Sequence, residues 1–264
     1  MKFFALALTL IIWGSTAVHA SDDLNVVRIA TEEYPPYTSE KLKHYGIDSH
    51  IVSESFRAEG IDVEYQFFSG ARSYAMAKEG SVDGTLPWAL RSERRQYFWY
   101  SDPVIQVDHE QFYFRSGLQF EWNPTTRDYT NLEGLRLAAI ISYNYGDEFQ
   151  KAEADGVIQV DRVGNLRQAF GMLLLDRVDI VISKGRVATY VLQSDFTKDE
   201  IAQLDYRSEN LKPASYDYLL FSKRSPNARH YLNAFNRGIK KLHASGDFDK
   251  LLRAFEAGDY ITAE

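Results

Sequence analysis

The chain has 264 residues, a formal net charge of −7 and no cysteine. Its hydrophobic content of 45% and charged content of 25% predict an ordinary globular core in one large or two modest domains. The acidic balance argues against nucleic acid or an anionic membrane as a partner, and the lack of cysteine excludes disulfides.

The first twenty residues are typical of a secretory signal peptide. Lys2 carries one positive charge, an apolar run covers residues 3–13, and small residues follow in the pattern Val18-His19-Ala20. The run is about half as long as the ~20 residues of a membrane-spanning helix. We therefore expect cleavage after Ala20, a mature chain with one lysine fewer, and a periplasmic location.

Strand and helix patterns alternate from residue 27 onward. Residues 27–30 read as a short buried strand, and apolar residues recur at helical spacing over 46–58. Residues 61–67 alternate as in a half-buried strand, and a helix over 71–79 precedes a strand that starts at Val82. This β-α-β-α-β order predicts a mainly parallel sheet with helices on its faces.

The same order then restarts. Residues 135–141 read as a strand, 146–154 as a helix and 157–160 as a strand. Asn165 is placed to cap a further helix, and the strand over 178–182 repeats the Val-Asp pair found at residues 82–83. We therefore expect two α/β lobes of similar design.

The remaining segments complete the two-lobe interpretation. The tail over residues 226–260 predicts two amphipathic helices separated at Gly246, and strand-like segments near residues 109–115 and 216–221 could cross between the lobes. Ligands of such sheets bind beyond the carboxyl ends of the strands and often between domains. The expected division is residues 21–113 and 219–264 for lobe 1 and residues 114–218 for lobe 2.

Motifs for metal, cofactor or nucleophilic chemistry are absent from the sequence. No two of the six histidines have the spacing of metal ligands on a helix, and no phosphate loop, dinucleotide fingerprint or nucleophile elbow occurs. We expect neither a metal nor a cofactor, and catalysis is not supported.

Three stretches carry a family resemblance. The first is Ile29-Ala30-Thr31-Glu32-Glu33-Tyr34-Pro35-Pro36-Tyr37. The second is Ser92-Glu93-Arg94-Arg95, followed by Tyr100-Ser101-Asp102-Pro103. The third is Arg177-Val178-Asp179, together with a C-terminal Ala244-Ser245-Gly246-Asp247-Phe248. Together they resemble the family 3 extracellular solute-binding proteins, the periplasmic receptors of polar amino acid ABC transporters. The resemblance implies a type II periplasmic-binding-protein fold, with two lobes joined by two crossing strands and closing on a ligand.

The resemblance also implies a set of ligand-binding residues. Arg94 matches the arginine that binds the ligand carboxylate, a role that suits its planar guanidinium. Tyr34 matches an aromatic residue that packs over the ligand, although it could equally be a wall of the first lobe. The segment Tyr143-Asn144-Tyr145 lies where the family has a helix N-terminus that holds the carboxylate.

Three further positions are candidates on the first lobe. Trp88 and Ala89 occupy places where the family often has small residues and a hydroxyl, so that Trp88 is either a stacking surface or part of the core. Arg72 begins a predicted helix and would face either the cleft or, as we expect more, the solvent.

The chain departs from the family at Lys184. Counting from Arg177, this slot holds an aspartate that pairs with the ligand's α-ammonium in the family, and a lysine there would oppose an ammonium 4 Å away by about 4 kcal/mol. Either Lys184 points away from the ligand, or the ligand has two acidic ends or lacks a nearby amine. Glu32 or Glu33 could offset this by offering a site for a cation.

The leading hypothesis is a monomeric periplasmic protein that captures a small carboxylate-bearing solute for the permease of an ABC importer, without catalysis. Two alternatives stay open. A few proteins of this fold are periplasmic dehydratases of cyclic amino acid precursors, and the protein could instead present its ligand to a membrane sensor.

Overall fold

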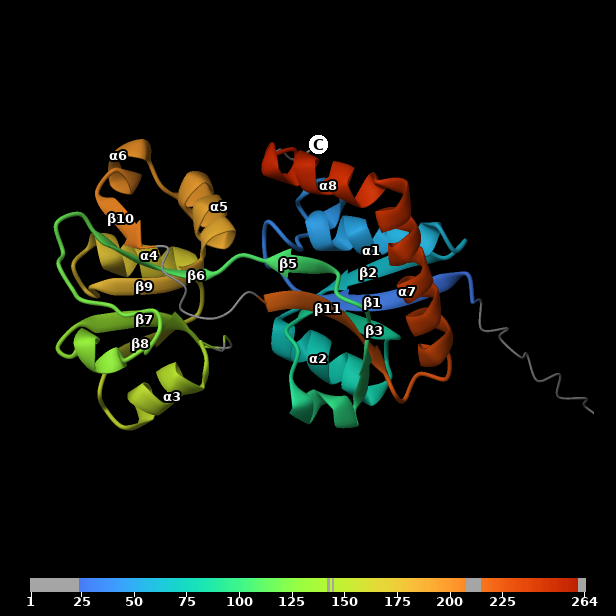
Figure 1. The fold of residues 1–264 in the computed structure, drawn as a ribbon, viewed down its shortest axis with the longest axis horizontal. Helices are drawn as coiled ribbons and strands as arrows, with labels where there is room; N and C mark the ends of the chain where they lie inside the picture. Colours follow the sequence, from blue (N-terminus) through green and yellow to red (C-terminus); the bar gives the residue numbers. More distant parts are fainter. Residues whose placement is uncertain (1–23, 142, 144, 208–214, 261–264) are drawn as a thin grey trace, which may run out of the picture.

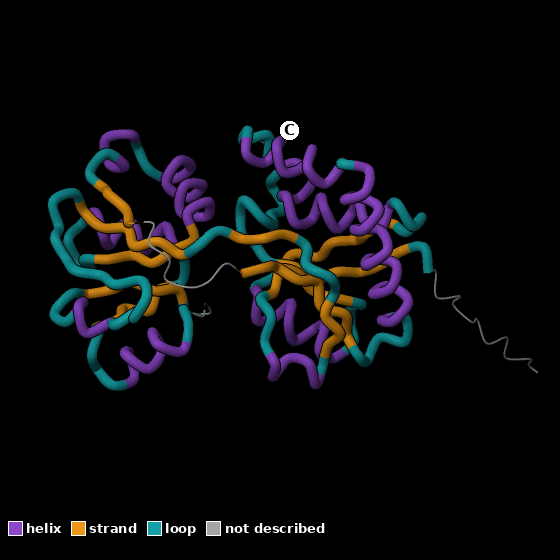
Figure 2. Tube along the Cα trace, viewed as in Figure 1, coloured by secondary structure: helices purple, strands orange, loops and turns teal. Residues whose placement is uncertain are grey.

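Two β-sheets, each with helices on both sides, form two lobes that lie side by side (Figures 1 and 2). The computed structural model describes residues 24–141, 143, 145–207 and 215–260. The predicted signal peptide over residues 1–20 lies outside the described residues. The expected α/β architecture with two lobes is confirmed.

The first lobe contains strands β1 (Val26–Thr31), β2 (Asp62–Phe67), β3 (Gly84–Trp88), β4 (Phe98–Tyr100), β5 (Ile105–Val107) and β11 (Ser215–Ser222). The strand order is β2-β1-β3-β11-β4, and β5 pairs with β11. β1 runs parallel to β2 and β3, while β11 runs antiparallel to β3. The helices are η1 (Lys43–Tyr45), α1 (Ile47–Arg57), α2 (Gly70–Glu79), η2 (Ser92–Gln96), α7 (Ala228–Ser245) and α8 (Asp247–Glu256).

The second lobe contains strands β6 (Glu110–Arg115), β7 (Arg136–Ile140), β8 (Gln159–Val163), β9 (Ile180–Lys184) and β10 (Leu204–Arg207) in the order β10-β6-β9-β7-β8. Its helices are η3 (Tyr129–Leu132), α3 (Asp147–Ala154), α4 (Leu166–Leu174), α5 (Gly185–Asp195) and α6 (Lys198–Ile201). The strand predicted over 157–160 begins two residues later, because the amide groups of Val157 and Ile158 both turn back to the carbonyl of Ala152.

The repeated Val-Asp pair has the same structural role in both lobes. The carboxylate of Asp83 accepts a hydrogen bond from the backbone N–H of Arg28 at 3.0 Å, and Asp179 accepts one from the backbone N–H of Arg136 at 2.8 Å. In each lobe the backbone N–H of the aspartate returns a bond to the same arginine's carbonyl. Each aspartate therefore joins the last strand of a β-α-β-α-β unit to the first.

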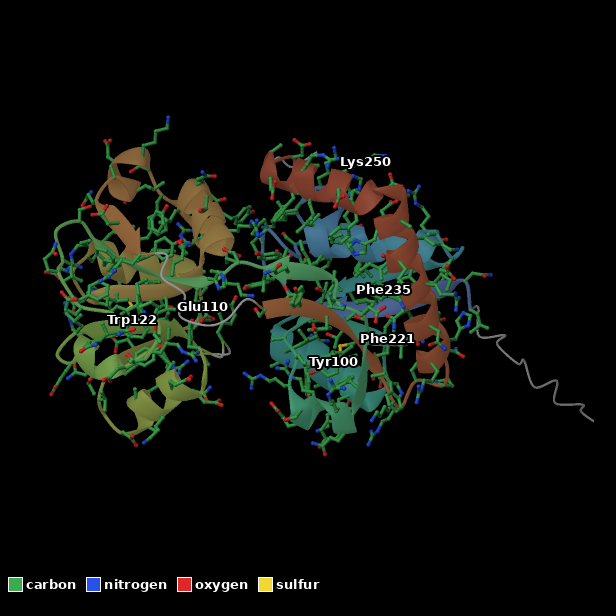
Figure 3. All side chains as sticks on the ribbon, in the orientation of Figure 1. Tyr100, Glu110, Trp122, Phe221, Phe235 and Lys250 are labelled. Carbon is green, nitrogen blue, oxygen red and sulfur yellow. The ribbon has the colours of Figure 1, made fainter. Side chains whose placement is uncertain are left out.

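The first lobe has a core between its sheet and the packed pair α1 and α7. Phe56 of α1 lies against Phe221 of β11 and Phe235 of α7, all three with no exposed surface. Figure 3 labels Phe221 and Phe235. Gly238 brings the two helices together, since a Cβ at this position would overlap the carbonyl oxygen of Ser55. Among the described residues, no helix is long and apolar enough to cross a membrane.

The chain passes from the first lobe to the second between β5 and β6. β5 pairs with β11 in the first lobe, whereas β6 pairs with β9 over its length in the second. β11 belongs entirely to the first sheet. The first change of sheet therefore lies between Val107 and Glu110, slightly before the expected boundary after residue 113, because residues 110–113 already pair with β9.

Candidate functional site

A cavity of about 390 Å³ lies between the two lobes, within the size range of sites for small molecules. It is lined by groups from both lobes and from the strands that join them: Glu32, Tyr34, Pro87, Trp88, Ala89, Arg91, Arg94, Glu110, Ile141, Tyr143, Tyr145, Gln150, Ser183, Lys184 and Asp217. Figure 3 shows Glu110 on the side of the second lobe that faces the first. Eight of the ten side chains predicted from the sequence line this cavity.

Arg94 has the surroundings of an anion-binding side chain. Its guanidinium lies over the ring of Trp88, 4.6 Å from Cζ to the ring centroid, and donates to the carbonyl of Ala89 at 3.0 Å. Within the described part of the chain it forms no ion pair, whereas Arg91 pairs with Glu93 at 3.4 Å. Burial lowers the pKa of Arg94 from its ordinary value, as expected for a half-buried cation without a counter-ion.

The fold places this arginine at the cleft for a local reason. β3 ends at Trp88, and the chain then turns through η2. The indole N–H of Trp88 donates to the hydroxyl of Thr85 at 3.0 Å, and Tyr74 of α2 packs against the same indole. Because Trp88 is held in this way, it presents a fixed surface to Arg94. Trp88 therefore stacks on a cation of the protein itself, the guanidinium of Arg94.

Aromatic side chains from the two lobes meet at the cavity. Tyr34 stacks on Tyr37 with 5.6 Å between centroids and meets Tyr143 of the second lobe edge to face at 5.7 Å. Tyr145 is almost fully buried, accepts the backbone N–H of Ile140 at 2.8 Å and packs in the second core, so that most of its contacts are structural. Asn144, predicted as a carboxylate-binding residue, lies outside the described residues.

Lys184 faces the cavity from the end of β9. Glu110 is its direct partner across the antiparallel pair β6 and β9, so that both side chains project from the same face of the sheet. The Lys184 ammonium lies 5.5 Å from the centroid of Tyr34 and 5.9 Å from that of Tyr37. Lys184 therefore reaches from the second lobe toward the aromatic rings of the first.

Glu32 lies at the opposite wall, directly after β1. It accepts a hydrogen bond from the backbone N–H of Gly70, the first residue of α2. Burial raises the pKa of Glu32 to about 7, with a further contribution from the charge of Asp217 and against the lowering effect of the Gly70 hydrogen bond. Glu32 therefore titrates near neutral pH.

Two carboxyl groups in the cavity were not predicted from the sequence, Glu110 and Asp217. Each is a carboxyl group on a strand face that is otherwise mostly apolar: Glu110 precedes Phe112 and Phe114, and Asp217 precedes Leu219 and Phe221. A carboxylate at an apolar position of a strand predicted to cross between lobes was the available signal.

The cavity holds charges of both signs. The cations Arg91, Arg94 and Lys184 share the cavity with the carboxyl groups of Glu32, Glu110 and Asp217. Arg72, the remaining candidate, does not line the cavity; it is exposed, with its guanidinium 4.2 Å from the ring centroid of Phe68. Within the described residues, no group of three His, Cys, Asp or Glu side chains is arranged to hold a metal ion.

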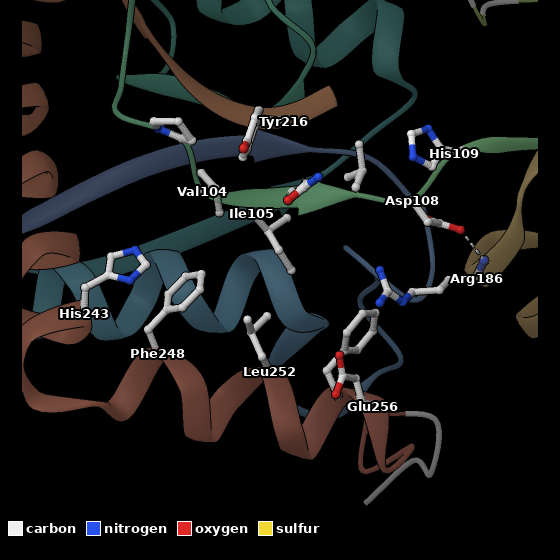
Figure 4. A pocket seen from close by; sticks show the side chains of 14 residues that line it. Val104, Ile105, Asp108, His109, Arg186, Tyr216, His243, Phe248, Leu252 and Glu256 are labelled. Atoms are coloured by element: carbon white, nitrogen blue, oxygen red, sulfur yellow. Dashed lines mark hydrogen bonds between the residues drawn. The ribbon is translucent and has the colours of Figure 1, made fainter. Parts of the chain in front are cut away.

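Two other cavities, of about 480 and 650 Å³, lie beside α8 and α5 on the other side of the joining strands. Figure 4 shows the first, with Phe248 and Leu252 of α8 facing Val104 and Ile105. The backbone N–H of Arg186 donates to the carboxylate of Asp108 at 2.8 Å, which ties α5 to the joining segment (Figure 4). These cavities are more apolar, and the arginine that lines both, Arg186, has its guanidinium 5.2 Å from the ring centroid of Phe255.

Comparisons with known proteins agree with this architecture. The profile of the bacterial extracellular solute-binding proteins, family 3, matches residues 27–257. An ancestral arginine-binding protein bound to arginine has 19% identity and a TM-score of 0.71, covering 87% of this chain and 97% of that chain. A protein from a study of glutathione import in Streptococcus mutans has 16% identity and a TM-score of 0.71, covering 90% and 97%.

A histidine kinase sensor domain also shares the fold, with 12% identity, a TM-score of 0.70 and coverage of 86% and 94%. A search of curated proteins found no significant match. At these identities, the structural likeness concerns the fold, and it says nothing of the ligand.

Proposed function

The chain belongs to the bacterial extracellular solute-binding proteins of family 3, and we propose that it captures a small carboxylate-bearing solute in the cavity between its lobes. Arg94 binds the solute's carboxylate through its guanidinium. Closure of the lobes then surrounds the solute with side chains from both sides. The protein does this outside the cytoplasm, after loss of the signal peptide.

One observation carries the assignment of Arg94. Its guanidinium is half-buried and preoriented by Trp88 and the Ala89 carbonyl, and it forms no ion pair within the described residues. A buried charge without a partner is costly, so a site that keeps one gains most from an arriving anion. The forked donors of a guanidinium fit the two oxygens of a carboxylate.

The hinge geometry supports capture by closure. The chain passes between lobes next to Asp108, whose carboxylate accepts from the Tyr37 hydroxyl of the first lobe and the Arg186 backbone N–H of the second. Tyr34 and Tyr143 meet across the cavity. A solute between them would contact both lobes, and its binding energy would favour the closed arrangement.

The solute we propose carries a positive as well as a negative group. A ligand with two acidic ends would meet Glu32, Glu110 and Asp217 in the same cavity. The register of Glu110 beside Lys184 supplies a nearby opposite charge for the lysine, so that Lys184 is a weaker obstacle to an ammonium than the sequence alone suggested.

The test is a thermal-shift screen over amino acids, dicarboxylates and small aromatic acids with the mature chain and two variants. We expect Arg94→Ala to lower affinity for the selected solute about 100-fold, which corresponds to ~2.7 kcal/mol, while its unfolding temperature without solute stays near that of wild type. Arg95→Ala, an exposed neighbour, is the control. Equal affinity in the two variants would refute the role of Arg94.

Delivery to an ABC importer is the role we propose for the loaded protein, with presentation to a membrane sensor as the alternative. Both use the closed form as the recognised state. Reconstitution with a candidate permease distinguishes them, because import requires stimulation of ATP hydrolysis by loaded protein, whereas a sensor partner responds without transport.

A dehydratase on this fold is a second candidate, favoured by Glu32. Its pKa of about 7 suits a group that donates or accepts a proton near neutral pH. Turnover of prephenate or arogenate by wild type but not by Glu32→Gln would establish it; the absence of turnover at high enzyme concentration would leave binding as the activity.

A further inference from the structure

Two buried carboxyl groups lie against each other next to the cavity. Asp48, in the first turn of α1, and Asp217, in β11, have exposed fractions of 0% and 4%. Their side chains are within hydrogen-bonding reach of each other. Three of their oxygens, both of Asp48 and Oδ2 of Asp217, accept no hydrogen bond from a donor among the described residues.

This contact implies a proton between the two side chains. An ionised carboxylate only accepts hydrogen bonds, so two of them in contact form a bond only when one is protonated. Two like charges in a buried site also oppose each other's ionisation. Burial accordingly raises the pKa of both Asp48 and Asp217, with the neighbouring aspartate adding to the effect on Asp48.

The surrounding charges balance one carboxylate and leave the other. Lys184 of the second lobe is the cation whose charge lowers the pKa of both aspartates, against the effect of burial. Its ammonium lies over Tyr34 and Tyr37, phenols that burial keeps protonated. Glu110 also lies beside this lysine on β6, so one lysine can compensate at most one of the two aspartates.

The other acidic neighbours add negative charge. Asp108 raises the pKa of Asp217, although its own carboxylate already accepts from Tyr37 and from the Arg186 backbone. Glu32 lies close enough to feel the charge of Asp217. Within the described part of the chain, Lys184 is the one cation whose charge is found to lower the pKa of either aspartate, so that a proton or a ligand must supply the second positive charge.

We propose that Asp48 and Asp217 form a cation subsite, which holds one proton while the cavity is empty and exchanges it for the ammonium or guanidinium group of a bound solute. Asp217 lines the cavity and contacts the solute, and Asp48 lies behind it. The proton passes to solvent as the solute's cation arrives, so that the net charge of the subsite is unchanged. This subsite rests on the proposed function and defines its solute as zwitterionic or cationic.

The proton is tested without any solute. The folded state keeps a proton that the unfolded chain releases, so unfolding is favoured as pH rises. Between pH 5 and the pKa of the pair, we expect the wild-type unfolding constant to rise with pH more steeply than that of Asp48→Asn, by up to tenfold per pH unit. Asp62→Asn, on an exposed strand position, should retain the wild-type slope.

Infrared spectroscopy of the folded wild type provides the second readout. At pH 8 Glu32 is mostly ionised, so we expect a neutral carboxyl C=O band that disappears in Asp217→Asn. If Asp48→Asn has the wild-type pH slope, or if wild type lacks this band, the shared proton is refuted.

The cation exchange is tested with pairs of solutes that differ by one positive charge: L-arginine against L-citrulline, and L-glutamate against 2-hydroxyglutarate. We expect the more positive member of at least one pair to bind wild type at least tenfold more tightly, with release of a proton in calorimetry across buffers. In Asp217→Asn the preference should fall below threefold. An equal or opposite preference in both pairs refutes the subsite, while loss of all binding in Arg94→Ala concerns the proposed function alone.

Discussion

Arg94 and Asp217 line the same cavity but lack opposite kinds of partner: in the part of the chain that the structure describes, Arg94 lacks an anion, and Oδ2 of Asp217 lacks a hydrogen-bond donor. Arg94 is a half-buried cation, held by Trp88 and a carbonyl, with no carboxylate partner among the described residues. Asp217 is a buried carboxyl group in contact with Asp48, with an oxygen that has no donor there. A solute with a carboxylate and a cationic group would satisfy both, whereas a diacid would satisfy one.

The first way to separate these regions is to neutralise Glu32 on the acidic side. Its folded pKa of about 7 lies above the ordinary value of 4.5, so its contribution to stability is present below the unfolded pKa and is lost as pH rises through about 7. Glu32→Gln should therefore stabilise the protein by about 3 kcal/mol at pH 8 and by little at pH 4. Denaturant unfolding at both pH values measures this.

Glu33→Gln is the matched control, because Glu33 is the exposed neighbour. It should leave stability unchanged at both pH values. A Glu32→Gln protein with no gain at pH 8 would show that Glu32 is solvated rather than buried.

The second way is to keep the positive charge at position 94 and remove the planar, forked guanidinium. A lysine places a point charge on a flexible chain and cannot form two parallel hydrogen bonds to a carboxylate. Arg94→Lys should weaken solute binding about 30-fold, or ~2 kcal/mol, less than Arg94→Ala. Calorimetric titration measures it. Affinity equal to wild type would mean that only the charge of Arg94 matters.

The third change affects the hinge between the two regions. Tyr37→Phe removes the hydroxyl that donates to Asp108 and should cost about 1 kcal/mol of stability, because the carboxylate keeps the Arg186 N–H as its other donor. Thermal unfolding detects the loss. Tyr216→Phe, at a half-exposed ring on β11, should be neutral; an equal loss in both variants would assign no special role to the Tyr37 hydroxyl.

Most of the fold was predictable because the spacing of apolar residues and a few local signals mark its helices and strands. Gly246 separates α7 and α8 as expected, with a φ of 77°, and Asn165 caps α4 by accepting from the Gln168 backbone N–H at 2.9 Å. The repeated Val-Asp pair predicted two equivalent units, and Asp83 and Asp179 have the same backbone partners in the two lobes.

The site was predictable only where a motif marked it. Arg94, Tyr34 and Lys184 stood out by their place in the family pattern, and all three line the cavity. The contact of Asp48 with Asp217 joins positions 169 residues apart, and its strength depends on burial, which the sequence does not display. The balance of charges around Lys184 was missed for the same reason, because register brings Glu110 beside it.

A crystal structure of the protein with the solute selected by the screen tests the account most directly. We expect the solute's carboxylate to lie within hydrogen-bonding distance of the Arg94 guanidinium, with contacts from Tyr34 of one lobe and Tyr143 of the other. A solute bound beside α5 and α8, with Arg94 left uncontacted, would contradict it.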